Sequence, residues 1–391
     1  MLLGFKTELI LNNKQRTLLA KHAGIARDAY NWGLDLTKQV LDHNKFNPTE
    51  KIKFPSAIDL HKWLVAIRKV EKPYYYEVSK CAPQYALRAL REAWDRCFKE
   101  TSDVPKFKKK GKNDSFTLDG TIKVIDHDKI QVPVIGKLRT YERLPFGYKP
   151  KSVTISRKAD KWFISYKVED VGRRCPPPFM VRETEPFSSN NSNAVGVDLG
   201  VLRFATLSTG EQVDSPMPLK KLGKKLSKLQ WRNRNKEKFS KNWQKAQTKI
   251  ARLHNHIANI RKDFIHKPPA AIAALRSPQS KLAGATKLAS ENQVIIIEDL
   301  NVSGMMANHK LSKAISDCGF YEFRCQLDYK IKLYSSELVI ADRWFASSKT
   351  CNNCGCRKES LSLSERTFKC EDCGFETDRD YNASLNLATL Y

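Results

Sequence analysis

Two Cys-x-x-Cys pairs near the C-terminus constrain this chain more than any other feature of its sequence. They consist of Cys351 and Cys354, a spacer of fifteen residues, and then Cys370 and Cys373. Each pair can present two thiolates to one ion, and tetrahedral zinc accepts both pairs. A glycine follows each pair and eases a tight turn there. A redox motif would instead be one such pair beside a βαβ unit, so the pattern predicts one structural zinc ion.

Charge and length indicate a protein of several domains with a polyanionic partner. The 391 residues carry 69 Lys and Arg against 42 Asp and Glu, a formal net charge of +27. Such a charge repels itself in the folded state unless a polyanion neutralises it, and nucleic acid is the usual polyanion. The alternatives are a merely basic protein or one that binds anionic membranes. This length predicts two or three domains, and the hydrophobic fraction of 41% suffices for their cores.

The sequence contains no pattern typical of a membrane span or an export signal. No apolar run reaches the roughly 18 to 20 residues that a membrane span needs. The apolar N-terminal stretch contains Lys6 and Glu8 and lacks a small-residue cleavage site, so no signal peptide is predicted. We therefore expect a cytosolic protein without a membrane partner, in which the six cysteines outside the two pairs stay reduced.

The N-terminal part has the pattern of a small β-domain with a helical unit inserted into it. Residues 1–10 predict a strand, and further strands are predicted within 103–170 from alternating apolar side chains. Residues 11–102 have helical periodicity, and an Asn pair at their start can cap the first helix. Residues 171–193 hold three consecutive prolines and a Ser/Asn-rich run, which is the composition of a linker.

Two basic segments are candidates for contact with phosphate groups. Residues 220–262 hold fifteen Lys or Arg and one acid, beside apolar residues spaced by threes and fours from Phe239 to Ile260. This pattern predicts one long helix with a basic outer surface. A merely solvated face is the alternative, although solubility alone favours mixed signs. The second segment is a basic loop after Pro105. The residues expected to bind nucleic acid are Lys106, Lys108, Lys109, Lys110, Lys224, Lys225, Lys228, Arg232 and Arg234.

Three acids lie at the ends of predicted elements. Asp198 and Glu298 each end a short apolar run, and Asp380 lies in the first turn of a predicted C-terminal helix. A lone acid there is often a cap or turn residue, but an uncompensated carboxylate beside a buried strand is costly. Metal coordination would remove that cost, and carboxylate oxygens suit Mg²⁺. Two Mg²⁺ ions roughly 4 Å apart could activate a water and stabilise the leaving oxygen in phosphodiester cleavage.

Four motifs follow one another in the C-terminal half. They are Val195-Gly196-Val197-Asp198-Leu199-Gly200, Ile297-Glu298-Asp299-Leu300-Asn301, Ser347-Ser348-Lys349-Thr350-Cys351-x2-Cys354-Gly355 and Asp378-Arg379-Asp380-x-Asn382-Ala383. In this order they resemble the TnpB family of transposon-encoded, RNA-guided DNA nucleases, which is similar to the compact type V CRISPR effectors. Further matches around Trp32 and Pro105 extend the resemblance over nearly the whole chain.

The resemblance implies an α+β protein of several domains. The implied domains are a β-barrel from residues 1–10 and 103–170, a helical recognition domain from 11–102, an RNase H-like (RuvC) α/β nuclease domain from 194–348 and 374–391, and a zinc ribbon inserted at 349–373. By motif, Asp198, Glu298 and Asp380 take the catalytic and magnesium-binding positions. The neighbouring Asp299 and Asp378 are assigned to structure, as turn or cap residues.

The function that the resemblance implies is RNA-guided, magnesium-dependent cleavage of double-stranded target DNA beside a short flanking motif. The enzyme would be encoded by an insertion-sequence transposon and would act at the nucleoid, in the cytoplasm of a prokaryotic cell. A guide RNA would read the target by base pairing. Two alternatives remain. A repressor with an inactive nuclease would be marked by a missing triad acid, and a transposase acting on DNA ends is disfavoured by the motif order.

One segment departs from the family pattern. Where the family continues within a few residues to a segment like Thr286-Lys287-Leu288-Ala289, this chain has about eighteen intervening residues, Pro268 to Ala285. The segment contains three prolines, and prolines inside a helix break it. It either loops out without effect or disturbs the approach to Glu298, with consequences for activity.

Overall fold

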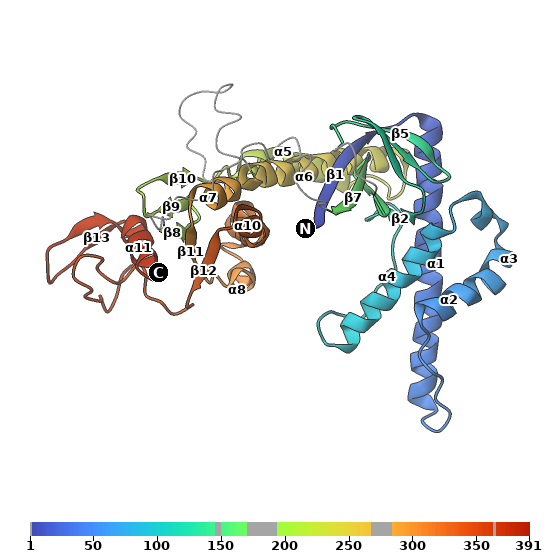
Figure 1. The fold of residues 1–391 in the computed structure, drawn as a ribbon, viewed down its shortest axis with the longest axis horizontal. Coiled ribbons are helices and arrows are strands. Elements are labelled where there is room, and N and C mark those ends of the chain that lie inside the picture. The colour runs from blue at the N-terminus through green and yellow to red at the C-terminus, as the bar shows by residue number, and fades with distance from the viewer. Residues whose placement is uncertain (1, 145–149, 170–193, 267–283, 363–364) are drawn as a thin grey trace. The chain divides into compact units, whose positions relative to one another are not determined.

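The computed structural model describes residues 2–144, 150–169, 194–266, 284–362 and 365–391 (Figure 1). The chain divides into two compact units, Met1–Val181 and Arg182–Tyr391. Each unit combines helices with a β-sheet, so the fold is α+β as predicted. Among the described residues, no helix has the length and apolarity to cross a membrane. The predicted linker 171–193 lies outside the described residues.

The first unit contains a seven-stranded sheet. Its strands are β1 (Leu2–Ile10), β2 (Ser115–Asp119), β3 (Lys123–Asp126), β4 (Lys129–Val132), β5 (Gly136–Thr140), β6 (Ser152–Lys158) and β7 (Lys161–Glu169). They are ordered β2-β6-β7-β1-β5-β4-β3, with β1 antiparallel to both β7 and β5. Among the described residues the edge strands β2 and β3 are not paired with each other, so the predicted barrel is not seen as a closed ring of hydrogen bonds.

The helices of the first unit lie between β1 and β2 in the chain. They are α1 (Asn13–Phe46), α2 (Ala57–Trp63), the π-helical turn η1 (Leu64–Arg68), α3 (Lys69–Glu71), the 3-10 turn η2 (Pro73–Glu77) and α4 (Cys81–Phe98). Asn12 caps α1 through reciprocal hydrogen bonds with Gln15. One continuous apolar core joins these helices to the sheet, and it includes Leu87 of α4 and Ile164 of β7.

The second unit contains a mixed five-stranded sheet with the order β10-β9-β8-β11-β12. Its strands are β8 (Ala194–Leu199), β9 (Arg203–Leu207), β10 (Gln212–Asp214), β11 (Val294–Glu298) and β12 (Glu337–Ala341). The first three form an antiparallel meander, whereas β11 and β12 run parallel to β8. The central strands β8 and β11 are apolar on both faces, as expected for parallel strands that are covered on both sides.

Helices cover both faces of this second sheet. The described helices of this unit are α5 (Pro218–Arg234), α6 (Lys241–His266), α7 (Ala285–Glu291), α8 (Val302–Ala307), α9 (Ser312–Cys318), α10 (Phe320–Tyr334) and α11 (Arg379–Ala388), of which α5 packs on α6 rather than on the sheet. Ile295 and Ile297 of β11 belong to the apolar cluster that contains Phe323 of α10. Ile296 points the other way and packs in the cluster of Leu387 on α11. Because side chains alternate in this way, the acid at the end of each strand points to the face opposite that of the residue before it.

The basic segment 220–262 forms two helices, so the prediction of one long helix is wrong. Residues 235–240 separate α5 from α6, and Phe239 there has a left-handed backbone with φ +68° that a right-handed helix cannot include. The two helices fold back on each other as a helical hairpin, in which Leu226 of α5 packs with Leu253 of α6. From the apolar row that ends at Ile260, Ile250, Leu253 and Ile257 pack against α5.

The two ends of the inserted segment lie side by side. Most of Pro268 to Ala285 falls on residues 267–283, outside the described residues. His266 ends α6, and its carbonyl accepts a hydrogen bond of 2.5 Å from the hydroxyl of Thr286 in α7. Lys330 of α10 donates to the same carbonyl at 3.3 Å. The described residues on either side of this segment are therefore in direct contact, and β11 follows α7 as a regular strand.

Candidate active site and zinc site

Asp198 and Glu298 lie at the same end of two adjacent strands. In the parallel pair β8 and β11, Val197 is opposite Ile297, and each acid is the next residue of its strand. Successive side chains of a strand point to opposite faces, so each acid points away from the face of the valine or isoleucine before it. Both acids therefore belong to the face of the sheet that α11 covers.

The start of α11 brings Asp380 to the same part of the second unit. Asp378 caps this helix, because its carboxylate accepts the backbone N–H of Asp380 at 3.0 Å and that of Tyr381 at 3.1 Å. The other oxygen of Asp378 pairs with Arg203 of β9 at 2.8 Å. The cap thus ties the helix to the sheet two residues before Asp380, in agreement with the structural role expected for Asp378.

Close packing of α11 on the sheet depends on Gly196. An ideal Cβ at this position would lie 2.0 Å from the carbonyl oxygen of Ser384 and 2.6 Å from the backbone nitrogen of Ala388. Both atoms belong to the backbone of α11 and cannot rotate away, so any side chain would push the helix off the sheet. Gly196 therefore helps to set the position of Asp380, although it carries no polar group.

The three carboxylates influence one another electrostatically. Burial raises the pKa of Asp198 well above its ordinary value, and the negative charges of Glu298 and Asp380 raise it further. Arg379 opposes this shift and contacts the carboxylate of Asp380 at 3.4 Å. The hydroxyl of Ser347 donates a hydrogen bond of 2.6 Å to one oxygen of Glu298. The structure thus brings the three predicted acids together in a partly buried and repulsive arrangement.

This group of oxygen donors suits a hard divalent cation. A cation between the carboxylates would offset the repulsion that raises the pKa of Asp198. Among the described residues, only the four cysteines form a set of three or more metal-ligating side chains whose ligand atoms already converge; the carboxylates are more open. The donor chemistry therefore fits a metal ion held between the two strands and α11.

The four predicted zinc ligands converge closely. Their sulfur atoms all lie within 4.8 Å of one another, with Cys351 to Cys373 at 3.7 Å and Cys354 to Cys370 at 3.5 Å. A zinc–sulfur bond of about 2.3 Å gives a tetrahedron edge of about 3.8 Å, so these separations fit one zinc ion. The backbone N–H of Phe375 and the side chain of Asn353 lower the pKa of Cys373, whereas hydrogen bonds with the neighbouring thiols raise the pKa of Cys354.

Hydrogen bonds join the cysteine-containing segment to α11. Asn382 of α11 donates to the carbonyl of Thr350 at 2.7 Å and accepts the backbone N–H of Asn352 at 3.1 Å. Asn386, one turn later, donates to the carbonyls of Ser347 and Thr350 at 2.7 Å. A short hairpin of β13 (Thr367–Lys369) and β14 (Glu376–Asp378) then leads directly into α11. The predicted zinc site is thus coupled to the helix that carries Asp380.

The predicted phosphate-binding residues of the helical hairpin are all exposed on α5. None of these five forms an ion pair with a residue that the structure describes, so their charges remain available to a polyanion. They are Lys224, Lys225, Lys228, Arg232 and Arg234. In the basic loop, Lys106, Lys108, Lys109 and Lys110 are exposed as well, with Lys106 near Asp103 at 3.6 Å.

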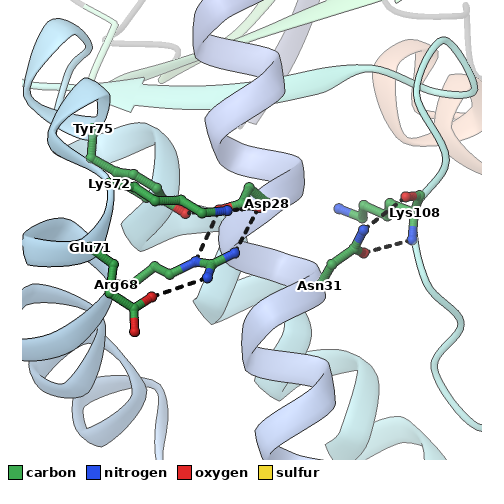
Figure 2. Close-up of polar contacts among 7 residues, drawn as sticks. All are labelled: Asp28, Asn31, Arg68, Glu71, Lys72, Tyr75 and Lys108. Atoms are coloured by element: carbon green, nitrogen blue, oxygen red, sulfur yellow. Dashed lines mark hydrogen bonds and ion pairs between the residues drawn. The ribbon is translucent and has the colours of Figure 1, made fainter.

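The basic loop is attached to the middle of α1 (Figure 2). The side-chain amide of Asn31 donates to the carbonyl of Lys108 at 3.0 Å and accepts its backbone N–H at 2.8 Å. The ammonium of Lys108 lies 4.0 Å from the centroid of the Tyr30 ring and is shielded from water there, which lowers its pKa although the residue as a whole is exposed. On the other side of α1, Asp28 binds a turn-rich segment through Arg68, Lys72 and Tyr75. The loop is thus held in place before any ligand binds.

No role was predicted for Gly196, Ser347 or Arg379, although all three lie within the four C-terminal motifs. Ser347 could have been noticed as a hydroxyl shortly before the first cysteine pair. Arg379 could have been noticed as a cation between two acids. Gly196 gave a weaker signal, since a glycine between two valines can mean a bulge or a close backbone contact. Only the packing of α11 distinguishes these readings.

Family comparisons cover separate parts of the chain. A family model described as a probable transposase matches residues 164–275. A model for the TNB domain of Cas12f1-like proteins matches residues 320–387, which include the four cysteines and Asp380. A helix-turn-helix model matches residues 1–45, although in this structure they form one strand, β1, and most of one continuous helix, α1.

Relatives match almost the full length of the chain. A Streptomyces pristinaespiralis protein named "Putative RNA-guided DNA endonuclease" is 32% identical, over 98% of this chain and 88% of its own. An Escherichia coli K12 protein of the same description is 30% identical, over 98% and 90%. A solved CRISPR-Cas12f ternary complex superimposes with 14% identity over 97% of this chain and 82% of that one, at a TM-score of 0.34, too low to support an inference. By its extended sequence matches, the chain belongs to the TnpB family.

Proposed function

We propose that this chain is an RNA-guided, metal-dependent DNA endonuclease that cleaves double-stranded target DNA beside a short flanking motif. The observation that carries the proposal is the meeting of Asp198, Glu298 and Asp380, which come from two strands and a helix. The relatives named as RNA-guided DNA endonucleases cover nearly the whole chain, and this supports a guide RNA and a target DNA as its partners.

An RNase H-like (RuvC) nuclease domain accounts for the architecture of the second unit. Three antiparallel strands with two further strands parallel to β8 place two acids at the ends of adjacent strands. The zinc ribbon then lies between β12 and α11 in the chain. In this proposal the first unit, with its sheet and helices, holds the guide RNA and the target duplex.

The three acids would hold Mg²⁺, in two ions, at the scissile phosphate. When bound, the metal would activate the attacking water and stabilise the leaving oxygen. Asp198 and Glu298 would bind it from the sheet, and Asp380 from the helix. The hydrogen bond from Ser347 orients Glu298 and leaves its second oxygen available as a ligand. Arg379 pairs with Asp380 and offsets part of the negative charge that the three acids would present to a phosphodiester.

Substitution of each acid tests this proposal. Asp198→Ala, Glu298→Ala and Asp380→Ala should each lower the cleavage rate at least about a hundredfold, because a misplaced metal loses its function at the phosphate. Binding of guide RNA and target should change little, since it depends on base pairing and on Lys and Arg contacts. The measurement is cleavage of a labelled target duplex by the purified complex with its guide RNA and Mg²⁺.

Asp299→Ala is the matched control. Asp299 follows Glu298 directly, but its carboxylate pairs with Arg324 at 2.8 Å and Arg343 at 2.5 Å. This variant should keep cleavage within about tenfold, as the loss of partly exposed ion pairs predicts. Cleavage that persists in all three triad variants would refute the assignment. A wild type that binds its target without cutting would instead indicate a repressor, and joined DNA ends would indicate a transposase.

A further inference from the structure

The helical hairpin of the second unit ends in exposed aromatic residues. Trp231 lies in the last turn of α5 and is 64% exposed, and Phe239 lies in the connection to α6 and is 76% exposed. We call residues 231–243 the hairpin tip. Large apolar rings in water are unfavourable unless something covers them, so two on one short segment indicate a binding surface.

The structure holds Phe239 in its exposed position. Its backbone is left-handed, which is costly for a residue with a side chain. The carbonyl of Phe239 accepts a hydrogen bond of 2.8 Å from the side chain of Gln244, and its ring lies 5.5 Å from that of Trp243. Ser240 begins the next helix by accepting the N–H of Trp243 at 3.2 Å. The ring is therefore presented to solvent by a fixed turn rather than by a loose side chain.

The charges around these rings identify the kind of partner. The hairpin tip contains one acid, Glu237, and its cations are all exposed. They are Arg232, Arg234, Lys236, Lys238 and Lys241. An apolar protein surface would gain nothing from so many cations of one sign, whereas a nucleic acid offers both phosphates for the cations and flat bases for the rings.

We propose that the hairpin tip binds single-stranded nucleic acid by stacking unpaired bases on Trp231 and Phe239, while the adjacent Lys and Arg contact phosphates. Bases inside a duplex have their flat faces covered by neighbouring pairs, so a stacking surface favours unpaired or terminal nucleotides. The inference rests on the proposed function in taking nucleic acid as the partner, and it adds the class of nucleotides that this hairpin recognises.

The test uses the full-length protein and two fluorescent probes of the same length. One probe is oligouridine of about twenty nucleotides, and the other is an abasic strand with the same number of phosphates. Trp231→Ala and Phe239→Ala should each weaken oligouridine binding about tenfold, since stacking contributes roughly 1–3 kcal/mol per base. Affinity for the abasic strand should not change, because no charge is removed. Phe46→Ala is the control, because Phe46 is also 76% exposed but lies at the end of α1.

Each other result overturns the inference. Unchanged oligouridine binding in both variants, or an equal loss with the abasic strand, would show that the rings do not stack on bases. A lower melting temperature without a change in affinity would show that the tip packs against protein. A wild type that binds neither probe would also contradict the proposed function, whereas equal binding of both probes would leave that function intact and remove only base stacking.

Discussion

Lys330 is a lysine that is almost fully buried, with 2% of its surface exposed. Its ammonium donates to the hydroxyl of Thr286 and to the carbonyl of His266 at the end of α6. Among the described residues no carboxylate forms an ion pair with it, and burial lowers its pKa to about 7. This side chain therefore connects α10 with α6 and α7, the helices at the two ends of the inserted segment. Its ammonium loses hydration by being buried there.

Stability of the second unit should therefore rise with pH from about 7 toward 10. An unfolded lysine keeps a pKa of about 10.4, so in this range the unfolded state binds more protons than the folded state. Lys330→Met keeps the volume of the side chain and removes this dependence. Melting temperatures measured at several pH values should show the wild type gaining relative to Lys330→Met. The exposed Lys332→Met on the same helix is the control, and parallel curves for Lys330→Met and the wild type would contradict the expectation.

Gly196→Ala should separate α11 from the sheet. The added methyl group meets backbone atoms of Ser384 and Ala388, so the helix has to move; overpacking of this kind costs about 1–3 kcal/mol. Because Asp380 moves with α11, cleavage should fall more than stability alone explains. Urea unfolding and cleavage rate measure the two effects.

Gly223→Ala is the control for this substitution. A Cβ at Gly223, inside α5, would have no atom within 4 Å, and alanine favours a helix by up to about 1 kcal/mol. This variant should be as stable as the wild type or more stable, and it should keep its cleavage rate. A Gly196→Ala protein that cuts as fast as Gly223→Ala would show that the close contact does not position Asp380.

The sequence predicted those helices and strands whose apolar periodicity continues without interruption. The strand expected at residues 1–10 is β1 in the structure, and the helix that the Asn pair was expected to cap is α1, with Asn12 as its cap. The break in the basic segment was missed because no glycine or proline marks residues 235–240. That break is stabilised by packing of α5 on α6, in which residues separated by several helical turns of chain, such as Leu226 and Leu253, meet; such contacts leave no local pattern.

The candidate site was predictable as a set of residues but not as a geometry. Asp198, Glu298 and Asp380 were identified from motifs and from their places at the ends of elements. Their proximity depends on the register between β8 and β11 and on the contact of α11 with Gly196, both of which are tertiary properties. The zinc ligands were easier to predict, because the spacing within each Cys-x-x-Cys pair is local.

Loss of zinc should disable cleavage through α11. Cys370→Ser should lower the zinc content and release the segment that Asn382 and Asn386 hold, so that Asp380 is displaced. Metal analysis should give about one zinc per chain for the wild type. Cys356→Ser is the control, because Cys356 is an exposed thiol outside the group of four. Full cleavage by a zinc-free Cys370→Ser protein would contradict this coupling.

The net charge of +27 predicts attraction to nucleic acid but does not say where nucleic acid binds. The structure separates two kinds of lysine. Lys21, Lys129 and Lys161 pair with nearby acids, so their charge is already compensated. The lysines on α5 have no such partners among the described residues. Lysines without an acidic partner attract counterions from solution, and they release these counterions when they bind a phosphate group; the α5 lysines are of this kind.

A comparison of two triple variants tests this distinction. The first replaces Lys224, Lys225 and Lys228 by Gln, and the second replaces Lys21, Lys129 and Lys161 by Gln. Each variant lowers the net charge by the same amount, so a difference between the two cannot come from net charge alone. If the α5 lysines contact phosphates, the first variant should lower the slope of log affinity against log salt by about 2 to 3, at roughly 0.7–0.9 for each lost contact.

The second variant is the control and should leave the slope nearly unchanged, because ion-paired lysines displace few counterions. Titration of guide RNA at several salt concentrations measures both slopes. Equal slopes in the two variants would show that net charge, and not the surface of α5, determines how this protein binds nucleic acid.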